Sequence, residues 1–401
     1  MNKLIVSICF YVPLVISCLN LQAMVSKFIA PSLAQLIAYL NLTLIVTGLI
    51  LFRNNVKTIS KTARLWFVFY ILYYSFGLLA SGVSGFQTSI IATLVPVIFF
   101  TGFFFLLSNR KEFLTYFKVI TICFVISSFI TILFVKFNIN MKTAEVHNWA
   151  LDRAGGVTGD ANAAAHTSIF AFIFFNQFFQ PTQLLNKVLK FIVLSLIFYS
   201  LILTFSTTGL FTFTIVFFLI NYKFFSGIRI ILFASAIPLF YIGIFTIQSQ
   251  AQNLSLSEAQ INKVNNLVNV LTLNFDEVDN SGRGELLENI TYYLYKNPIM
   301  GNGVDFSVFM RAHNTYVGIW VDAGIFTFLF FLFILFFYFL KTWTLNPQLR
   351  FFAMSILLVL YIFMISLQSV INQPYLIVLF AFLGYLIDFK KLNKEASDTV
   401  K

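Results

Sequence analysis

The stretch DNSGRGELLENITYYLYKNPIMGNGVDFSVFMRAHNTYVGIWVDAG, residues 279–324, is polar in a chain that is otherwise strongly apolar. It holds Arg283, Arg311 and His313, which is one of the 3 histidines of the chain. Loops held by a rigid scaffold commonly carry binding and catalytic residues. If the flanking sequence forms membrane helices, this stretch is a loop held between them.

The composition of the chain is that of a membrane protein. Of its 401 residues, 59% are hydrophobic and 10% are charged, and the mean hydropathy is +0.88. A soluble domain has about 25% charged residues, so this chain has too little charge to cover a surface that faces water. The net charge of +11 does not indicate nucleic-acid binding, because the basic residues lie scattered in short gaps between apolar segments. That distribution is typical of cytoplasmic loops.

Long charge-free segments predict helices that span a membrane. The longest segments are expected to break at residues 81–85, 206–209 and 372–374, where small, polar or helix-breaking residues gather. The prediction is an all-α, polytopic membrane protein with about twelve transmembrane helices of about 20 residues each. The expected order is helices 1–5 in 1–135, a first long outside loop in 136–162, helices 6–9 in 163–248, a large helical outside loop in 249–314, helices 10–12 in 315–388 and a cytoplasmic tail in 389–401.

The basic residues orient these predicted helices. With the N-terminus inside, most of the 26 lysines and arginines fall in cytoplasmic gaps and in the tail, as the positive-inside rule requires. A single tilted helix over 191–222 would move every later loop to the other side and remove most of this bias. Both termini are therefore predicted to be cytoplasmic. Lys3, the apolar run and Cys18 also fit a lipoprotein signal, but the run continues into a multispanning protein, which favours a first span.

The first outside loop ends in a glycine-rich motif, RAGGVTGDAN, residues 153–162. Asp160 or Asn162 is expected to cap the helix that follows. Glycines such as Gly156 allow a ligand to approach the backbone closely. Arg153 could bind an anion there; the alternative is an ordinary loop in which Arg153 pairs with a neighbouring carboxylate or a lipid phosphate.

Two helices are predicted in the large outside loop. Apolar residues at helical spacing in 258–273 favour an amphipathic helix on the membrane surface. A second apolar stripe predicts a helix that begins at Arg283 and ends before Pro298. A helix N-terminus attracts anions, and an arginine there would add a bidentate phosphate clamp. The alternative is that Arg283 pairs with a nearby carboxylate such as Glu285.

The loop ends at the predicted entry of the tenth span with Arg311, His313 and Asn314. A histidine at this place could act as a general base or hold an acceptor hydroxyl; the alternative is a capping or interfacial histidine. On a helix, Asp322 would lie half a turn out of phase with His313 and ~13 Å along the axis. Asp322 is therefore expected to meet another polar group of the bundle rather than to orient His313.

Neither a metal nor a cofactor is expected. The acidic cluster at 276–279 lacks supporting ligands, and the chain has no glycine-rich phosphate loop. An outward-facing site with Arg153, Arg283 and Arg311 suits a lipid-linked phosphate or diphosphate instead. Fixed arginines can stabilise a departing diphosphate electrostatically, while His313 serves the incoming hydroxyl.

These motifs together resemble the O-antigen ligase and Wzy-type polymerase family of bacterial membrane glycosyltransferases. The resemblance covers most of residues 150–340 and implies a GT-C-like helical fold. It also implies metal-independent, inverting transfer of a glycan from undecaprenyl diphosphate at the outer face of the cytoplasmic membrane. The matching motifs, in chain order, are Arg153-x-x-Gly156, Gly159-Asp160-x-Asn162, Gly282-Arg283, Pro298-x-x-Gly301-x-Gly303, Ala312-His313-Asn314-Thr315-Tyr316 and Asp322-x-Gly324-Ile325.

The resemblance also assigns roles to residues. Arg283 and Arg153 would bind the diphosphate, and His313 would activate or position the acceptor hydroxyl. The remaining substrate-binding candidates are Arg311, Gly156, Asn162 and Asn314. In one departure, Thr207 stands where many members of the family have an arginine, and Arg311 is the candidate to supply that charge.

Three functions follow from these observations. A polymerase would join one undecaprenyl-diphosphate-linked repeat unit to another, and a ligase would move the finished glycan to lipid A-core. The motifs do not separate the two; polymerases diverge more strongly, which favours a polymerase. A lipid-linked sugar transporter is the alternative of another class, but it should bury ionisable residues near the membrane midplane. The expected partners are the lipid-linked donor, a glycan or lipid A-core acceptor, membrane lipid and a chain-length regulator, without nucleic acid.

Overall fold

The computed structural model describes residues 3–139, 141, 153–224, 242, 245–246, 248–250, 253, 257–274, 277, 283–367 and 370–389, and its regular elements there are helices. The chain divides into two compact units. Unit 1 comprises Met1–Cys123 and Arg283–Lys401, and unit 2 comprises Phe124–Gly282. The boundary between the first part of unit 1 and unit 2 falls inside α7 (Arg110–Lys136).

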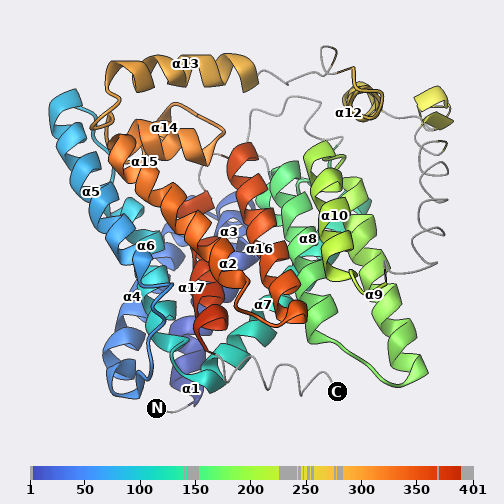
Figure 1. The fold of residues 1–401 in the computed structure, drawn as a ribbon, viewed down its shortest axis with the longest axis horizontal. Coiled ribbons are helices and arrows are strands. Elements are labelled where there is room, and N and C mark those ends of the chain that lie inside the picture. The colour runs from blue at the N-terminus through green and yellow to red at the C-terminus, as the bar shows by residue number, and fades with distance from the viewer. Residues whose placement is uncertain are drawn as a thin grey trace. The chain divides into compact units, whose positions relative to one another are not determined.

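Unit 1 contains the N-terminal helices and the C-terminal helices (Figure 1). Prolines begin α4, α16 and α17, a position that tolerates proline because the first turn needs no N–H donor there. The elements of unit 1 are α1 (Lys3–Val6), η1 (Ser7–Tyr11), α2 (Val12–Cys18), α3 (Leu21–Phe28), α4 (Pro31–Phe52), η2 (Arg53–Asn55), α5 (Leu65–Ser84), α6 (Ile90–Leu106), the first half of α7, α13 (Arg283–Lys296), α14 (Phe306–Phe309), α15 (Thr315–Thr342), α16 (Pro347–Ser366), η6 (Val370–Asn372) and α17 (Pro374–Asp388).

Unit 2 is built around α8, which packs against α9 and α10. Its elements are the second half of α7, η4 (Gly156–Thr158), α8 (Ala161–Phe178), α9 (Leu184–Leu203), α10 (Thr207–Ile220) and α12 (Glu258–Leu271). The predicted amphipathic helix over 258–273 is present as α12, in which Val264 and Val268 are buried.

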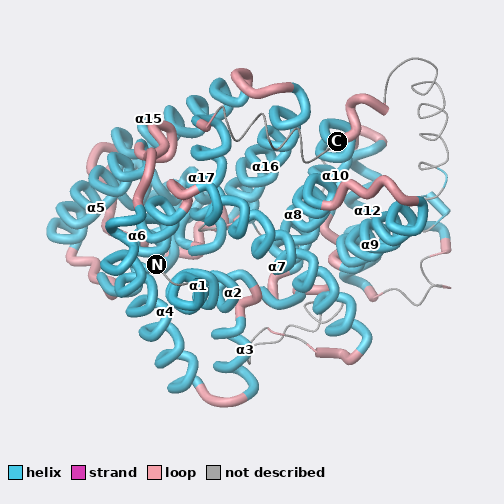
Figure 2. Tube along the Cα trace, turned by 90° about the horizontal axis from the view of Figure 1, so that it is seen from below, coloured by secondary structure: helices cyan, strands magenta, loops and turns pink. Residues whose placement is uncertain are grey.

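The prediction of a polytopic helical membrane protein is confirmed. Among the described residues, 6 helices are long and apolar enough to cross a membrane, or 7 if the bent pair Lys3–Cys18 and Leu21–Phe28 is one span. This pair bends by 64°, and Figure 2 shows α3 turning away from α2. Three shorter apolar helices, α6, α10 and α17, join them.

A break between two helices lies at or directly beside each of the three predicted places, although residues 81–84 still belong to α5 and residues 207–209 to α10. A break separates α5 from α6 after Ser84, α9 from α10 after Leu203, and α16 from α17 after Ser366. The last of the helices predicted in 163–248 lies largely outside the described residues, since most of 225–248 does.

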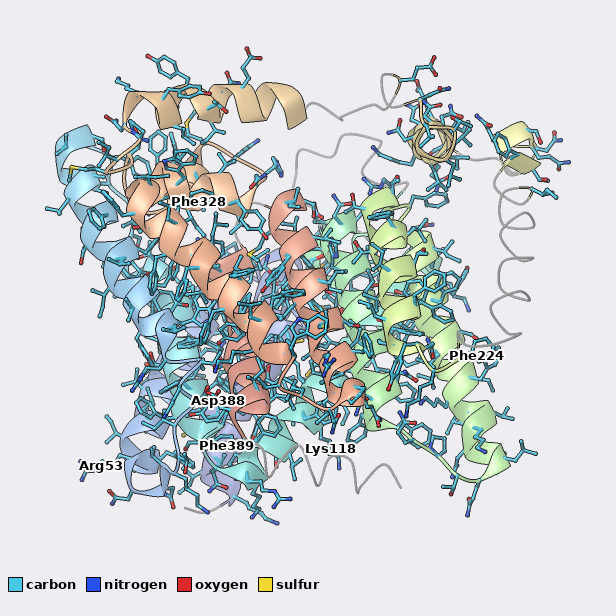
Figure 3. The ribbon with its side chains drawn as sticks, viewed as in Figure 1. Arg53, Lys118, Phe224, Phe328, Asp388 and Phe389 are labelled. Carbon is cyan, nitrogen blue, oxygen red and sulfur yellow. The ribbon has the colours of Figure 1, made fainter. Side chains whose placement is uncertain are left out.

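Different helices and side chains lie at the two ends of unit 1. At one end α13 lies across α5, α14 and α15 (Figure 1). Arg53, Lys118 and Asp388 lie at the other end (Figure 3). The buried side chains Ile290 and Leu294 of α13 pack with Phe306, Ala312 and Val321 in one apolar cluster. The predicted apolar stripe of α13 is therefore the face that holds this helix to the end of the unit.

Candidate functional site

Helix α15 is broken near its start, and a loop takes over the missing hydrogen bonds. Gly324 has φ 78° and ψ 177°, which are not helical angles. A break of this kind leaves carbonyl and N–H groups without helical partners. The carbonyls of Val321 and Asp322 accept instead from the N–H groups of Asn302 at 2.7 Å and Gly303 at 3.0 Å. The N–H of Ile325 donates to the Pro298 carbonyl at 3.0 Å.

The glycines of this region permit the close approach of the two backbones. Gly301 has φ +84°, and a Cβ there would lie 2.5 Å from the Asp322 carbonyl oxygen. A Cβ on Gly324 would clash with the carbonyl oxygen of Ile299. The motif Pro298-x-x-Gly301-x-Gly303 and the motif Asp322-x-Gly324 therefore form one structure, in which the loop replaces a turn of helix.

Asp322 is buried beside this break, with 3% of its surface exposed. Its Oδ1 accepts from the Ser307 N–H at 2.6 Å, and its Oδ2 accepts from the Ser307 hydroxyl at 3.0 Å. The Tyr73 hydroxyl, on α5, donates to Oδ2 at 2.8 Å. Asp322 thus meets polar groups of the bundle, as predicted, and joins α5, α14 and α15.

A second carboxylate, that of Asp305, also contacts the hydroxyl of Tyr73. The Asp305 Oδ1 atom is 3.3 Å from the Tyr73 hydroxyl and accepts from the Asn372 side-chain amide at 2.8 Å. Burial raises the pKa of Asp305 above its ordinary value, while the hydrogen bonds from Asn372 and Tyr73 act in the opposite direction. Asp305 therefore favours its proton more than an exposed aspartate does.

The turn between α14 and α15 holds two residues in the left-handed conformation. Arg311 has φ 55° and His313 has φ 47°, an arrangement that costs about 1–3 kcal/mol for each residue that is not glycine. Ala312 between them is buried, with 2% exposure, and its N–H donates to the Ser307 carbonyl at 3.1 Å. Arg311 is exposed and His313 is half-buried. Backbone strain of this kind gathers at functional sites, which makes the turn a candidate site.

Asn314 follows the turn and caps α15, since its side-chain oxygen accepts from the Val317 N–H at 3.1 Å. The cap fixes where the helix begins. It therefore also fixes the direction in which the chain leaves His313.

In unit 2, Arg153 joins two motifs that are distant in sequence. Its Nε donates to the Thr204 carbonyl at 3.1 Å, and its terminal nitrogen lies 3.5 Å from Asn162 Oδ1. The same oxygen of Asn162 accepts from the Ser206 hydroxyl at 2.8 Å. The motif at 153–162 and the segment at 204–209 therefore meet around Asn162.

The cap of α8 is Asp160, whose Oδ1 accepts from the N–H groups of Asn162 and Ala163, each at 2.9 Å. Of the two predicted caps, Asp160 is therefore the correct one, and Asn162 is left to bind Ser206. Gly156 has φ +52°, and a Cβ there would clash with the hydroxyl of Thr131.

Sequence reasoning missed Thr204 and Ser206 as partners of the first motif. Ser206 also caps α10, because its hydroxyl accepts from the Gly209 N–H at 3.1 Å. A serine before a predicted helix start is a signal that could have found the cap. The bond to Asn162 depends on tertiary contact and has no such local signal.

The predicted site residues fall in both units. Arg283, Arg311, His313 and Asn314 belong to unit 1, whereas Arg153, Gly156 and Asn162 belong to unit 2. Arg283 is the first residue of α13, as predicted.

Of the acidic cluster predicted not to bind metal, Asp276 and Asp279 lie outside the described residues. Within the described ranges no group of at least 3 His, Cys, Asp or Glu side chains is placed to hold a metal ion.

A comparison with known protein families gives a match over part of the chain. Residues 192–332 match the O-antigen ligase family. The match confirms the family resemblance predicted from the sequence. It includes the segment at 204–209, α13, the loop at 298–303 and the turn that carries His313. The matched residues contain both the break in α15 and the strained turn, while Arg153 lies outside them. No curated protein matches the chain.

Proposed function

We propose that this protein is a polymerase that joins undecaprenyl-diphosphate-linked oligosaccharide repeat units at the outer face of the cytoplasmic membrane. Its products would be O-antigen, capsule or exopolysaccharide chains. The observation that carries the proposal is the O-antigen ligase match over residues 192–332, which includes the strained turn with Arg311 and His313. The many apolar helices, together with this family, indicate a membrane enzyme of the ligase or polymerase type.

The proposed reaction is an inverting glycosyl transfer without a metal. The acceptor hydroxyl oxygen attacks the anomeric carbon of the donor, and the bond from that carbon to the diphosphate oxygen breaks. The diphosphate leaves with the electron pair, and the hydroxyl proton passes to a ring nitrogen of His313. Arg283 and Arg153 balance the charge that develops on the diphosphate. Arg311, Gly156, Asn162 and Asn314 complete the proposed substrate-binding set.

The arrangement of unit 1 supports this orientation in the membrane. Arg53 and Lys118 lie at the end of the unit opposite to α13 and α14. Positive charge favours the cytoplasmic side, so α13, α14 and the turn would face outward. About twelve spans with both termini inside fit this placement.

A transporter is less favoured than an enzyme. Within unit 1 the exposed Arg311 lies in the turn that precedes α15, and its neighbour Ala312 packs in the apolar cluster with Ile290 and Leu294 of α13. A transport site would place its charged groups near the membrane midplane instead. The arginine is therefore better placed to meet a headgroup than to line a pathway.

The ligase remains the second candidate, because the matched family is that of O-antigen ligases. A gel of envelope glycolipids from a deletion strain, complemented with the wild-type protein or with His313→Ala, separates the two. Lipid A-core with a single repeat unit in the deletion strain would support the polymerase. Bare lipid A-core, with long glycan retained on undecaprenyl diphosphate, would support the ligase and overturn the polymerase.

A further inference from the structure

A continuous set of hydrogen bonds connects the transmembrane part of unit 1 to the turn that carries His313. Tyr73 on α5 donates to Asp322 on α15 at 2.8 Å. Asp322 accepts from both the N–H and the hydroxyl of Ser307 on α14, at 2.6 and 3.0 Å. The carbonyl of Ser307 then accepts from the N–H of Ala312 at 3.1 Å, between the two left-handed residues of the turn.

The short helix α14 depends on such bonds for its position. It has 4 residues, and an isolated helix of this length is not stable because nucleation is unfavourable. Ser307 is 3% exposed and Asp322 is also buried. Buried polar groups without partners would cost more than the bonds themselves contribute, so Ser307 and Asp322 hold each other in one arrangement.

We propose that Asp322 is a positioning residue for the proposed transfer. Through Ser307 it fixes α14, and through the Ser307 carbonyl it fixes the strained turn in which His313 meets the acceptor. Tyr73 in turn fixes the carboxylate of Asp322. The inference rests on the proposed function, because a positioning role needs a reaction at His313. Asp322 acts through other residues and touches no substrate in this scheme.

The chain offers a matched control at the opposite end of unit 1. Asp388, at the end of α17, accepts from the Ser60 hydroxyl at 2.7 Å and from the N–H and the hydroxyl of Thr62, each at 2.8 Å. Both aspartates thus accept one backbone N–H and two hydroxyls. Figure 3 shows Asp388 at the end away from α13. Asp388→Ala should therefore remove a similar set of bonds without moving the turn.

The experiment compares full-length Asp322→Ala and Asp388→Ala, purified in lipid nanodiscs, with a synthetic undecaprenyl-diphosphate-linked repeat unit as the donor. Two measurements are made: the kinetics of transfer, which give kcat and KM, and hydrogen exchange of a peptide over residues 305–316. Misplacing a reacting group by about 1 Å can cost on the order of 100-fold in rate. We expect Asp322→Ala to lower kcat on that order, with little change in KM for the donor, and to speed exchange in the peptide. Asp388→Ala should leave both near wild type.

Conservative variants keep the test independent of folding. Asp322→Asn retains an oxygen for the Ser307 N–H and an amide that can donate to the Ser307 hydroxyl, so it should recover most of the lost rate. Tyr73→Phe removes the hydroxyl that donates to Asp322 at 2.8 Å, together with its longer contacts to the carboxylate and the N–H of Asp305, each at 3.3 Å. It leaves both bonds between Asp322 and Ser307 in place, so it should give an intermediate loss with the same exchange signature. If Asp322→Ala does not fold, the graded effects of these two variants decide the question.

The outcomes separate this inference from the proposed function. If the wild-type protein transfers no glycan, or His313→Ala is fully active, the proposed reaction at His313 is wrong and the positioning role fails with it. If His313→Ala is inactive while Asp322→Ala and Tyr73→Phe keep the kcat of the Asp388→Ala control, only the positioning role is overturned. A slowed reaction with unchanged exchange over 305–316 would also refute it.

Discussion

Substituting Gly324 with alanine tests whether the broken helix is a required feature of the fold. The residue has φ 78° and ψ 177°, a region that is occupied almost only by glycine and costs about 1–3 kcal/mol for other residues. The new Cβ would also clash with the Ile299 carbonyl oxygen. Because the clash is with backbone, the loop must move rather than a flexible side chain.

The magnitude follows from the hydrogen bonds that join the loop to α15. Moving the loop would disturb the bonds made by the N–H groups of Asn302, Gly303 and Ile325. Each such bond contributes about 0.5–1.5 kcal/mol. Together with the conformational cost, the expected loss is about 2.5–7.5 kcal/mol, which is large beside the total stability of a domain.

The assay is thermal unfolding of purified Gly324→Ala in detergent, together with its level in the membrane. The matched control is Gly82→Ala in α5, since no atom lies within 4 Å of a Cβ at Gly82. Alanine inside a helix is favoured over glycine by up to about 1 kcal/mol, so the control should be neutral or more stable. Equal unfolding temperatures for the two variants would show that the break does not need its glycine.

Three further predictions concern single side chains. His313→Ala should abolish transfer while the protein remains in the membrane at its normal level; normal envelope glycan on a gel would contradict the role of this residue. Arg283→Lys should also lose most activity, because a point charge cannot reproduce a bidentate clamp, and full transfer by the lysine variant would indicate a simple surface charge. Burial raises the pKa of Asp305, so the ionised form is disfavoured in the folded protein. Its contribution to stability should fall as the pH rises from about 3.9, the ordinary value, to the raised pKa. Asp305→Asn should remove this fall in stability. The unfolding temperatures of the wild type and the variant, measured between pH 4 and 7, test the prediction. Parallel pH profiles of the two proteins would refute it.

Local sequence patterns determined the helices and their ends. Long charge-free segments form helices because the interior of a membrane offers no water to bind the backbone. Each N–H and carbonyl group must then be paired within the segment, as it is in a helix. The breaks after Ser84 and Leu203, and the cap at Asp160, follow from residue types that favour turns or accept the first free N–H groups. The start of α13 at Arg283 is likewise a local signal. The family resemblance also rests on short motifs that the sequence displays directly.

Only the tertiary structure decided how those motifs act together. The loop after α13 enters the break in α15, and this could not be read from either segment because each alone has unsatisfied backbone groups that the other completes. Tyr73 and Asp322 are 249 residues apart, so their bond leaves no periodic trace in the sequence. The left-handed backbone at Arg311 and His313 is also decided by the tertiary structure, because positive φ is uncommon for residues other than glycine and no local motif specifies two such residues on either side of Ala312. The turn contacts groups outside itself, because Ala312 is buried and donates to the carbonyl of Ser307, which in turn is bonded to Asp322.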